Sequence, residues 1–213
     1  MTRRVLLWWG VGAILMATAL GAALTAGGPD VPSMIDVWWN AMMADIRSPV
    51  LVGFGTVLDQ IGGSRVATVV SLIAVAALLI IRRWRAAVFV TTALLASVLV
   101  TQLLKVVFGR VRPEDILVVS DFGSFPSGHT ANAATFAVLA VLLAPRLWVL
   151  LIAAVWIVGM AFSRTVLAAH WLSDTVGGML IGVGVTLVVG GLMLEWARSP
   201  RPPAPNDQAE ELT

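Results

Sequence analysis

The chain alternates between long apolar runs and short polar connections. An α-helix rises about 1.5 Å per residue, so about 20 residues cross the ~30 Å hydrocarbon core of a bilayer. Apolar runs that meet or approach this length lie at residues 5–26, 66–82, 86–107, 129–145, 147–166 and 171–195. The pattern therefore predicts an all-α, polytopic membrane protein with six transmembrane helices.

The connection between the first two predicted spans, residues 29–65, has a different pattern. Positions 34–47 have helical periodicity, with apolar side chains on one side and polar ones opposite. The apolar set is Ile35, Trp38, Trp39, Met42, Met43 and Ile46, and the polar set is Asp36, Asn40 and Arg47. Such a helix is typical of the membrane interface, and packing against the other helices is the alternative. Residues 49–58 are apolar but too short to span, which indicates a re-entrant or buried segment.

The first apolar run follows two arginines, as the hydrophobic region of a signal peptide would. At about 20 residues it is longer than such a region, and the cleavage pattern at residues 24–26 is poor, so an uncleaved span is favoured. We expect one integral membrane domain over residues 1–198, with its motif core at 66–195. Residues 199–213 are rich in proline and polar residues, which predicts a disordered cytoplasmic tail.

Composition supports a membrane protein, because 59% of the residues are hydrophobic and only 12% are charged. A soluble domain has about 25% charged residues. The sequence pI is near 10.4 although the net charge is only +2. With no cysteine or tyrosine, few groups titrate between histidine and lysine, so this pI gives no argument for nucleic-acid binding. The lack of cysteine also excludes disulfides, thiolate metal sites and cysteine nucleophiles.

Basic residues suggest how the chain is oriented, because cytoplasmic loops carry an excess of lysine and arginine. One set of span ends carries Arg3, Arg4, Arg82, Arg83, Arg85, Arg146, Arg198 and Arg201, and the other carries Arg47, Arg65, Lys105, Arg110, Arg112 and Arg164. The bias is small, but half of the second set belongs to the candidate site described next, and acidic residues crowd that side. We therefore expect both termini in the cytoplasm and the second set of ends on the outer face.

The chain has two histidines, and its span spacing brings both to one membrane face. From His129 to His170 is 41 residues, which corresponds to two crossings and returns the chain to the face that it left. Lys105 ends the third predicted span on that face, and Arg112 lies in the loop that leads to Pro126. Cations, imidazoles and a carboxylate gathered at one surface are the groups that phosphoryl transfer requires.

Local spacing supports the same chemistry. His170 and Asp174 are four residues apart and share a helix face, so the carboxylate can fix the imidazole tautomer and leave one nitrogen free to attack phosphorus. Pro126, Ser127 and Gly128 precede a predicted helix, and Ser127 is a plausible N-cap. The positive helix end would face an anion, and Gly128 would let that anion approach the backbone.

Each of these residues has a simpler interpretation when it is taken alone. A histidine at a span boundary is usually a packing residue, Lys105 or Arg112 could extend to lipid headgroups, and Ser163 could bond its own helix. Asp174 lies inside an apolar span, where a charge costs ~2.5–3.5 kcal/mol on insertion scales, so a partner is expected. A stripe of small residues on the last span is interpreted as structural; it comprises Gly178, Gly182, Thr186 and Gly190.

Taken together, these residues make the chain resemble the type 2 phosphatidic acid phosphatase superfamily, the lipid phosphate phosphatases. The family pattern is K-x6-RP, then PSGH, then SR-x5-H-x3-D. The chain matches it without substitution at Lys105-x6-Arg112-Pro113, Pro126-Ser127-Gly128-His129 and Ser163-Arg164-x5-His170-x3-Asp174. The resemblance covers residues from about 66 to 195, and the 29–65 segment is matched only in general character.

The resemblance implies a role for each motif residue and requires neither a metal ion nor a cofactor. His170 would form a phosphohistidine, Asp174 would orient it, and His129 would protonate the departing oxygen and then activate water. The phosphoryl oxygens would be held by Lys105, Arg112, Ser127, Gly128 and Arg164. The expected substrate is a lipid phosphate or diphosphate at the outer face of a bacterial membrane. Undecaprenyl diphosphate is the first choice, with phosphatidylglycerol phosphate and phosphatidic acid as alternatives.

Two other classes of protein could account for part of this pattern. A membrane serine hydrolase could use Ser127 with a histidine, but Gly-x-Ser-x-Gly is absent and Phe125 stands where an intramembrane serine protease has glycine. A non-enzymatic anion-binding or transport protein could use the cations. It would not need His170 and Asp174 at this spacing.

Overall fold

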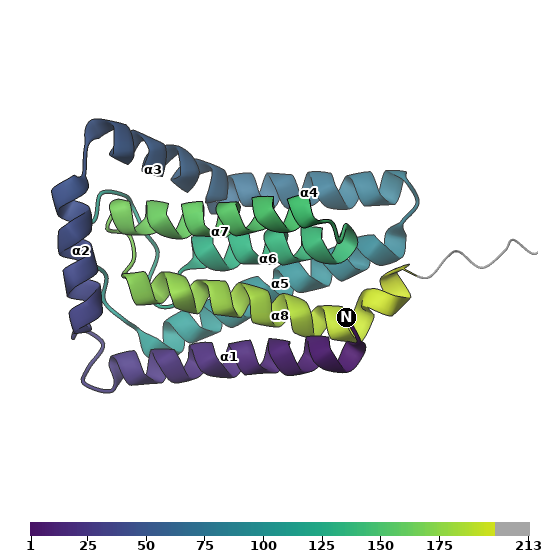
Figure 1. Cartoon of the computed structure of the whole chain (residues 1–213), viewed down its shortest axis with the longest axis horizontal. Coiled ribbons are helices and arrows are strands. Elements are labelled where there is room, and N and C mark those ends of the chain that lie inside the picture. Colours follow the sequence, from purple (N-terminus) through teal and green to yellow (C-terminus); the bar gives the residue numbers. More distant parts are fainter. Residues whose placement is uncertain (199–213) are drawn as a thin grey trace, which may run out of the picture.

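A computed structural model describes residues 1–198, and these residues form eight helices and no strand. The helices are α1 (Arg3–Thr25), α2 (Met34–Ile46), α3 (Pro49–Gly62), α4 (Ser64–Ile80), α5 (Trp84–Phe108), α6 (Gly128–Leu143), α7 (Leu147–Val166) and α8 (Leu172–Arg198). Helices α1 and α4–α8 run along the molecule, whereas α2 lies across one end (Figure 1). The predicted tail, residues 199–213, lies outside the described part of the chain.

The all-α prediction is confirmed, but the count of six spans is not. Four described helices, α1, α5, α7 and α8, are long and apolar enough to cross a membrane. Helices α4 and α6 are apolar but have 17 and 16 residues. Helix α6 stops at Leu143 because Pro145 cannot continue it, and α4 stops before Arg82, whose φ is 58°. Helices α2 and α3 pass the test only as a pair, which is bent by 118°.

Helix α8 packs against α1, α5 and α6, and its glycines permit the closest contacts. A Cβ atom on Gly178 would lie 2.4 Å from the Ser127 carbonyl oxygen, and one on Gly182 would lie 2.2 Å from the Ala131 carbonyl oxygen. The predicted close-packing stripe is therefore confirmed, and α6 is the helix that it contacts. This contact fixes the start of α6 against the start of α8.

Helix α2 forms as predicted, with Ser33 as its N-cap. The side that faces the protein carries Asp36, which is fully buried, and Met43, whereas Ile35 and Trp38 on the apolar side are 66% and 60% exposed. The helix lies across the end of the bundle where the α5–α6 and α7–α8 loops gather (Figure 1). Exposed apolar side chains over buried polar ones suit a helix at a membrane surface, and the interfacial location stays a prediction.

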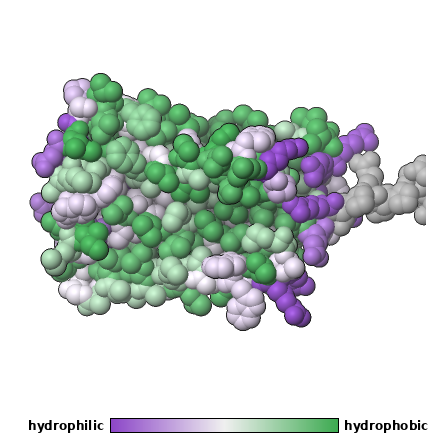
Figure 2. Space-filling model, viewed as in Figure 1, coloured by the Kyte–Doolittle hydropathy of each residue, from purple (hydrophilic) through white to green (hydrophobic). Residues whose placement is uncertain are grey.

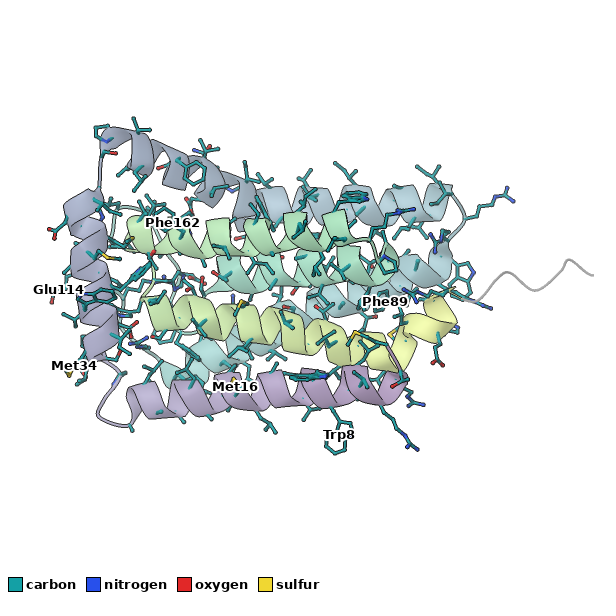
Figure 3. The ribbon with its side chains drawn as sticks, viewed as in Figure 1. Trp8, Met16, Met34, Phe89, Glu114 and Phe162 are labelled. Carbon is teal, nitrogen blue, oxygen red and sulfur yellow. The ribbon has the colours of Figure 1, made fainter. Side chains whose placement is uncertain are left out.

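The outer surface of the bundle is apolar over its middle, and hydrophilic residues gather at the end where the tail begins (Figure 2). Trp8 of α1 points away from the bundle and is 77% exposed (Figure 3). The end opposite α2 collects the described members of the first basic set, which are Arg3, Arg4, Arg82, Arg83, Arg85, Arg146 and Arg198. A band of exposed apolar residues between two polar ends is the surface that a bilayer requires.

Candidate active site

The three sequence motifs meet at the α2 end of the bundle. A cavity of about 620 Å³ lies there, and the motif residues on its wall are Arg112, Gly128, His129, Arg164 and His170. They come from the α5–α6 loop, the start of α6, the end of α7 and the α7–α8 loop. Helices α4 and α5 form most of the rest of the wall, with contributions from α3, from α6 and from residues 119–121 of the α5–α6 loop. Lys105, Ser127 and Asp174 are buried and lie behind the wall.

The His170 imidazole is almost fully buried, and a backbone carbonyl fixes its orientation. Its Nδ1 atom lies 2.8 Å from the Ser124 carbonyl oxygen, which can only accept a hydrogen bond. The proton must therefore sit on Nδ1, and Nε2 carries the lone pair. The nearest Asp174 oxygen is 3.7 Å from Nδ1, which is too long for a hydrogen bond. The predicted hydrogen bond from His170 Nδ1 to the Asp174 carboxylate is thus replaced by one to the Ser124 carbonyl oxygen, because other donors occupy the carboxylate.

Asp174 acts on His170 through its neighbours. Its carboxylate accepts a hydrogen bond from the Ser124 hydroxyl and another, 2.9 Å long, from the Trp171 backbone N–H. The Nη1 atom of Arg110 lies 2.6 Å from the same carboxylate. Asp174 therefore positions Ser124, whose backbone carbonyl orients the His170 imidazole. It also caps the first turn of α8.

Arg110 and Asp36 are buried residues that belong to no motif in the sequence, yet they lie behind the site. Arg110 Nη2 lies 2.8 Å from Asp36 of α2, so one guanidinium joins two buried carboxylates, those of Asp36 and Asp174. Ser173 also donates to Asp36 from both its backbone N–H and its hydroxyl. One feature of the sequence indicated that such a partner exists: Asp174 places a charge inside an apolar run, and a charge there requires an oppositely charged partner.

The pKa of His170 is lowered to about 3, chiefly by burial. The Asp174 carboxylate acts to raise this pKa, and the positive charges of Arg112 and Lys105 act to lower it. The imidazole is therefore neutral at physiological pH, and the Nε2 lone pair is not protonated. A neutral imidazole with one free lone pair is the form that can act as a nucleophile.

Lys105 and Arg112 converge on one carboxylate oxygen of the loop residue Asp121. The Lys105 Nζ atom lies 3.1 Å from Asp121 Oδ1, and the Arg112 Nη2 atom lies 2.7 Å from it. Both cations also donate to the Gly123 carbonyl oxygen. The Arg112 Nη1 atom is 3.0 Å from His170 Nε2. Burial alone would raise the pKa of Asp121, but the two cations outweigh it and hold the pKa below its usual range.

Arg164 and His129 converge on a second carboxylate, Asp59 of α3. Its Oδ1 atom lies 3.1 Å from His129 Nε2 and accepts a hydrogen bond from Arg164 Nη1. Arg164 is buried, and its Nη2 atom has no hydrogen-bond partner among the described residues. That unpaired donor can bind an anion in the cavity. Asp59 lies in the 29–65 segment, where no sequence pattern linked it to the motifs.

Ser127 caps α6 as predicted, since its side chain accepts from the Thr130 backbone N–H. Its hydroxyl is buried, also accepts from the Thr130 hydroxyl, and lies off the cavity wall. Gly128 lies on the wall, so its backbone is the part of this motif closest to an anion in the cavity. Ser163 bonds its own helix through the Met160 carbonyl oxygen, which is its simpler interpretation.

Two curated relatives match part of the chain. One is the lipid A 1-phosphatase of Rhizobium johnstonii, which is 34% identical over 43% of this chain and 41% of the relative. The other is phosphatidylglycerophosphatase B of Escherichia coli, which is 43% identical over 38% of this chain and 33% of the relative. The matches thus span less than half the length of these two relatives.

A solved structure matches most of the fold. It is the transmembrane PAP2-type phosphatidylglycerolphosphate phosphatase of Bacillus subtilis, with a TM-score of 0.76 and 27% identity over 87% of this chain and 96% of that one. These relatives and the apolar helices support a bacterial membrane protein. The profile of the PAP2 superfamily matches residues 86–196, just over half of the chain, and this range holds all three motifs. The chain therefore belongs to the PAP2 superfamily.

Proposed function

We propose that the chain is a membrane phosphatase that removes the terminal phosphate from a lipid, with His170 as the nucleophile. One observation carries the proposal: the neutral imidazole of His170 shares a cavity wall with Arg112 and Arg164 and with the second histidine, His129. An anion-transport protein would need the cations but not a buried imidazole with a fixed tautomer. A serine nucleophile is not favoured, because the Ser127 hydroxyl lies off the cavity wall.

In the first step, the lone pair on His170 Nε2 forms a bond to phosphorus, and the bond between phosphorus and the lipid oxygen breaks. The electron pair of the broken bond stays on the departing oxygen, and protonated His129 donates a proton to it. A monoester then releases a lipid alcohol, and a diphosphate releases a lipid monophosphate. His170 becomes a positively charged phosphoimidazole, and the Asp174 carboxylate 3.7 Å away offsets that charge.

In the second step, His129 removes a proton from a water molecule, and the water oxygen attacks phosphorus. The bond from phosphorus to His170 Nε2 breaks, and its electron pair returns to the nitrogen. Inorganic phosphate leaves, and both histidines regain their starting states. Lys105, Arg112 and Arg164 would stabilise the pentavalent states, in which the equatorial oxygens carry more negative charge than in the substrate.

The shape of the cavity supports a lipid substrate. From the phosphate end it continues between α4 and α5, where apolar wall residues include Leu72, Val75, Leu94, Leu95 and Val98. An apolar chain attached to a bound phosphate can lie along this wall and bury its surface. Undecaprenyl diphosphate and phosphatidylglycerol phosphate both carry a terminal phosphate and long apolar chains. The names of the Escherichia coli and Bacillus subtilis relatives favour phosphatidylglycerol phosphate, so we place it first.

We also propose that the site faces the outer side of the cytoplasmic membrane and that both termini are cytoplasmic. The basic end of the bundle carries both the start of α1 and the end of α8. Lysine and arginine are enriched on the cytoplasmic side, so this end should face the cytoplasm. The cavity and α2 would then lie at the opposite surface.

The proposal is tested by measuring inorganic phosphate release by the purified chain in detergent with EDTA. Phosphatidylglycerol phosphate, undecaprenyl diphosphate and phosphatidic acid are compared at equal concentrations. Release from at least one lipid, lost in a His170→Ala variant, is the expected result. Equal release by the wild type and the variant would contradict His170 as the nucleophile. No release from any lipid would favour an anion-binding role.

A further inference from the structure

The Asp121 carboxylate binds Lys105 and Arg112, two donors that the proposed reaction requires for the phosphoryl group. Its Oδ1 atom bridges Lys105 Nζ at 3.1 Å and Arg112 Nη2 at 2.7 Å. These are two of the three cations proposed to hold the phosphoryl oxygens. An oxygen anion shared by two cationic donors has the position and charge that a phosphoryl oxygen would have in this site.

The three side chains differ in their freedom to move. The Lys105 and Arg112 side chains are 2% and 13% exposed, whereas that of Asp121 is 57% exposed. Arg112 is further held by the Ala169 and Gly123 carbonyl oxygens. Asp121 lies in the loop between α5 and α6, so its side chain can rotate toward the solvent while the two cations stay in place.

Arg112 links this pairing to the nucleophile. Its Nη1 atom lies 3.0 Å from Nε2 and 3.4 Å from Nδ1 of His170, so the guanidinium lies over the face of the imidazole and leaves the in-plane Nε2 lone pair free. The same guanidinium bonds the Asp121 carboxylate through Nη2. An anion held by Arg112 is therefore held beside the nucleophile.

We propose that Asp121 competes with the substrate phosphate for Lys105 and Arg112 and so sets the affinity of the site for phosphate. The substrate phosphate displaces the carboxylate, and the carboxylate returns when inorganic phosphate leaves. This inference rests on the proposed function for the identity of the substrate. The competition itself involves only binding, so it can be measured without turnover.

The test is equilibrium binding of inorganic phosphate to the purified full chain, measured by titration calorimetry for the wild type and Asp121→Asn. Removing the competing charge should tighten phosphate binding about tenfold or more. Asp115→Asn is the matched control, because Asp115 lies in the same loop and pairs with Arg47 instead. It should change phosphate affinity less than twofold.

The opposite result would overturn the inference. If Asp121 serves only to hold Lys105 and Arg112 in position, Asp121→Asn will bind phosphate equally or more weakly. Asp121→Ser removes the same charge with a smaller side chain and must give the same direction, and a thermal melt of each variant verifies its fold. Tighter binding in a chain that releases phosphate from no lipid would leave the inference standing and reject the proposed function. If the wild type releases phosphate from a lipid but Asp121→Asn binds inorganic phosphate no more tightly than the wild type, the inference is rejected and the proposed function stands.

Discussion

At the scale of single residues, two carboxylates outside the motifs each bridge a pair of motif residues. Asp59 joins Arg164 to His129, and Asp121 joins Lys105 to Arg112. The motif residues could be found from the sequence because their types and spacing are fixed by the chemistry. Their partners could not, because an aspartate 70 residues before His129 has no local pattern that marks it.

Replacing Asp59 tests whether it positions His129 for proton donation. Asp59→Asn keeps the size of the side chain but removes the charge that pairs with the imidazole. We expect kcat for a lipid monoester to fall about tenfold, since general acid–base catalysis contributes ~10²–10⁴-fold and the imidazole itself remains. For p-nitrophenyl phosphate, whose leaving group needs little protonation, kcat should fall much less. An equal loss on both substrates would indicate that Asp59 only supports the fold.

The low pKa of His170 predicts how stability depends on pH. In the unfolded chain the imidazole takes up a proton near its ordinary pKa of ~6.5, but in the folded chain only near about 3. Between these values the unfolded state binds more protons, so stability should fall as pH falls through this window. The Tm of the wild type should drop more steeply from pH 6.5 to 4 than that of His170→Asn. Parallel curves would contradict the buried, neutral imidazole.

At the scale of helices, the position of α8 decides where the site forms. Its glycines bring α6 close enough for the Ser127 N–H to donate to the Asp174 carbonyl oxygen at 2.9 Å, which joins the second and third motifs. The sequence predicted this stripe because small residues recur on one helix face. The sequence did not predict which side of α2 faces the bundle, because an amphipathic pattern does not tell whether the polar side faces water or buried charges.

A substitution in the stripe tests the α6–α8 contact. The side chain of Gly182→Ala would place Cβ 2.2 Å from the Ala131 carbonyl oxygen, so the helices must separate. We expect a loss of about 1–3 kcal/mol, the usual cost of overpacking, and a lower Tm. Gly12→Ala on α1 is the control, because a Cβ there has no neighbour within 4 Å. It should leave Tm unchanged or raise it, since alanine favours a helix over glycine.

At the scale of the whole molecule, the bundle has one basic end and one end that holds the site. The helix positions were predicted to within a few residues because apolar length is a strong signal. The span count was not, because α4 and α6 are too short and α3 follows a sharp bend. Pro145 and the turn at Arg82 end α6 and α4, and mean hydropathy alone does not mark where a helix ends.

The orientation can be measured directly because the chain has no cysteine of its own. Glu114→Cys introduces an exposed thiol beside α2, at the site end (Figure 3). Arg146→Cys introduces one in the turn between α6 and α7, at the basic end. A membrane-impermeant maleimide added to intact bacterial spheroplasts should label the first variant, and the second only after permeabilisation. The reverse pattern would place the site in the cytoplasm.

The central claim, that phosphate passes through His170, is tested most directly by finding the phosphate on the protein. With p-nitrophenyl phosphate, whose leaving group needs little protonation, a His129→Ala variant should accept phosphate faster than it releases it, because the residue proposed to activate water is missing. Rapid quenching during incubation with p-nitrophenyl phosphate, followed by peptide mass spectrometry under alkaline conditions, should show an acid-labile phosphate on His170. Phosphate on Ser127, or release by the wild type with no modified His170 in any quenched sample, would contradict the account.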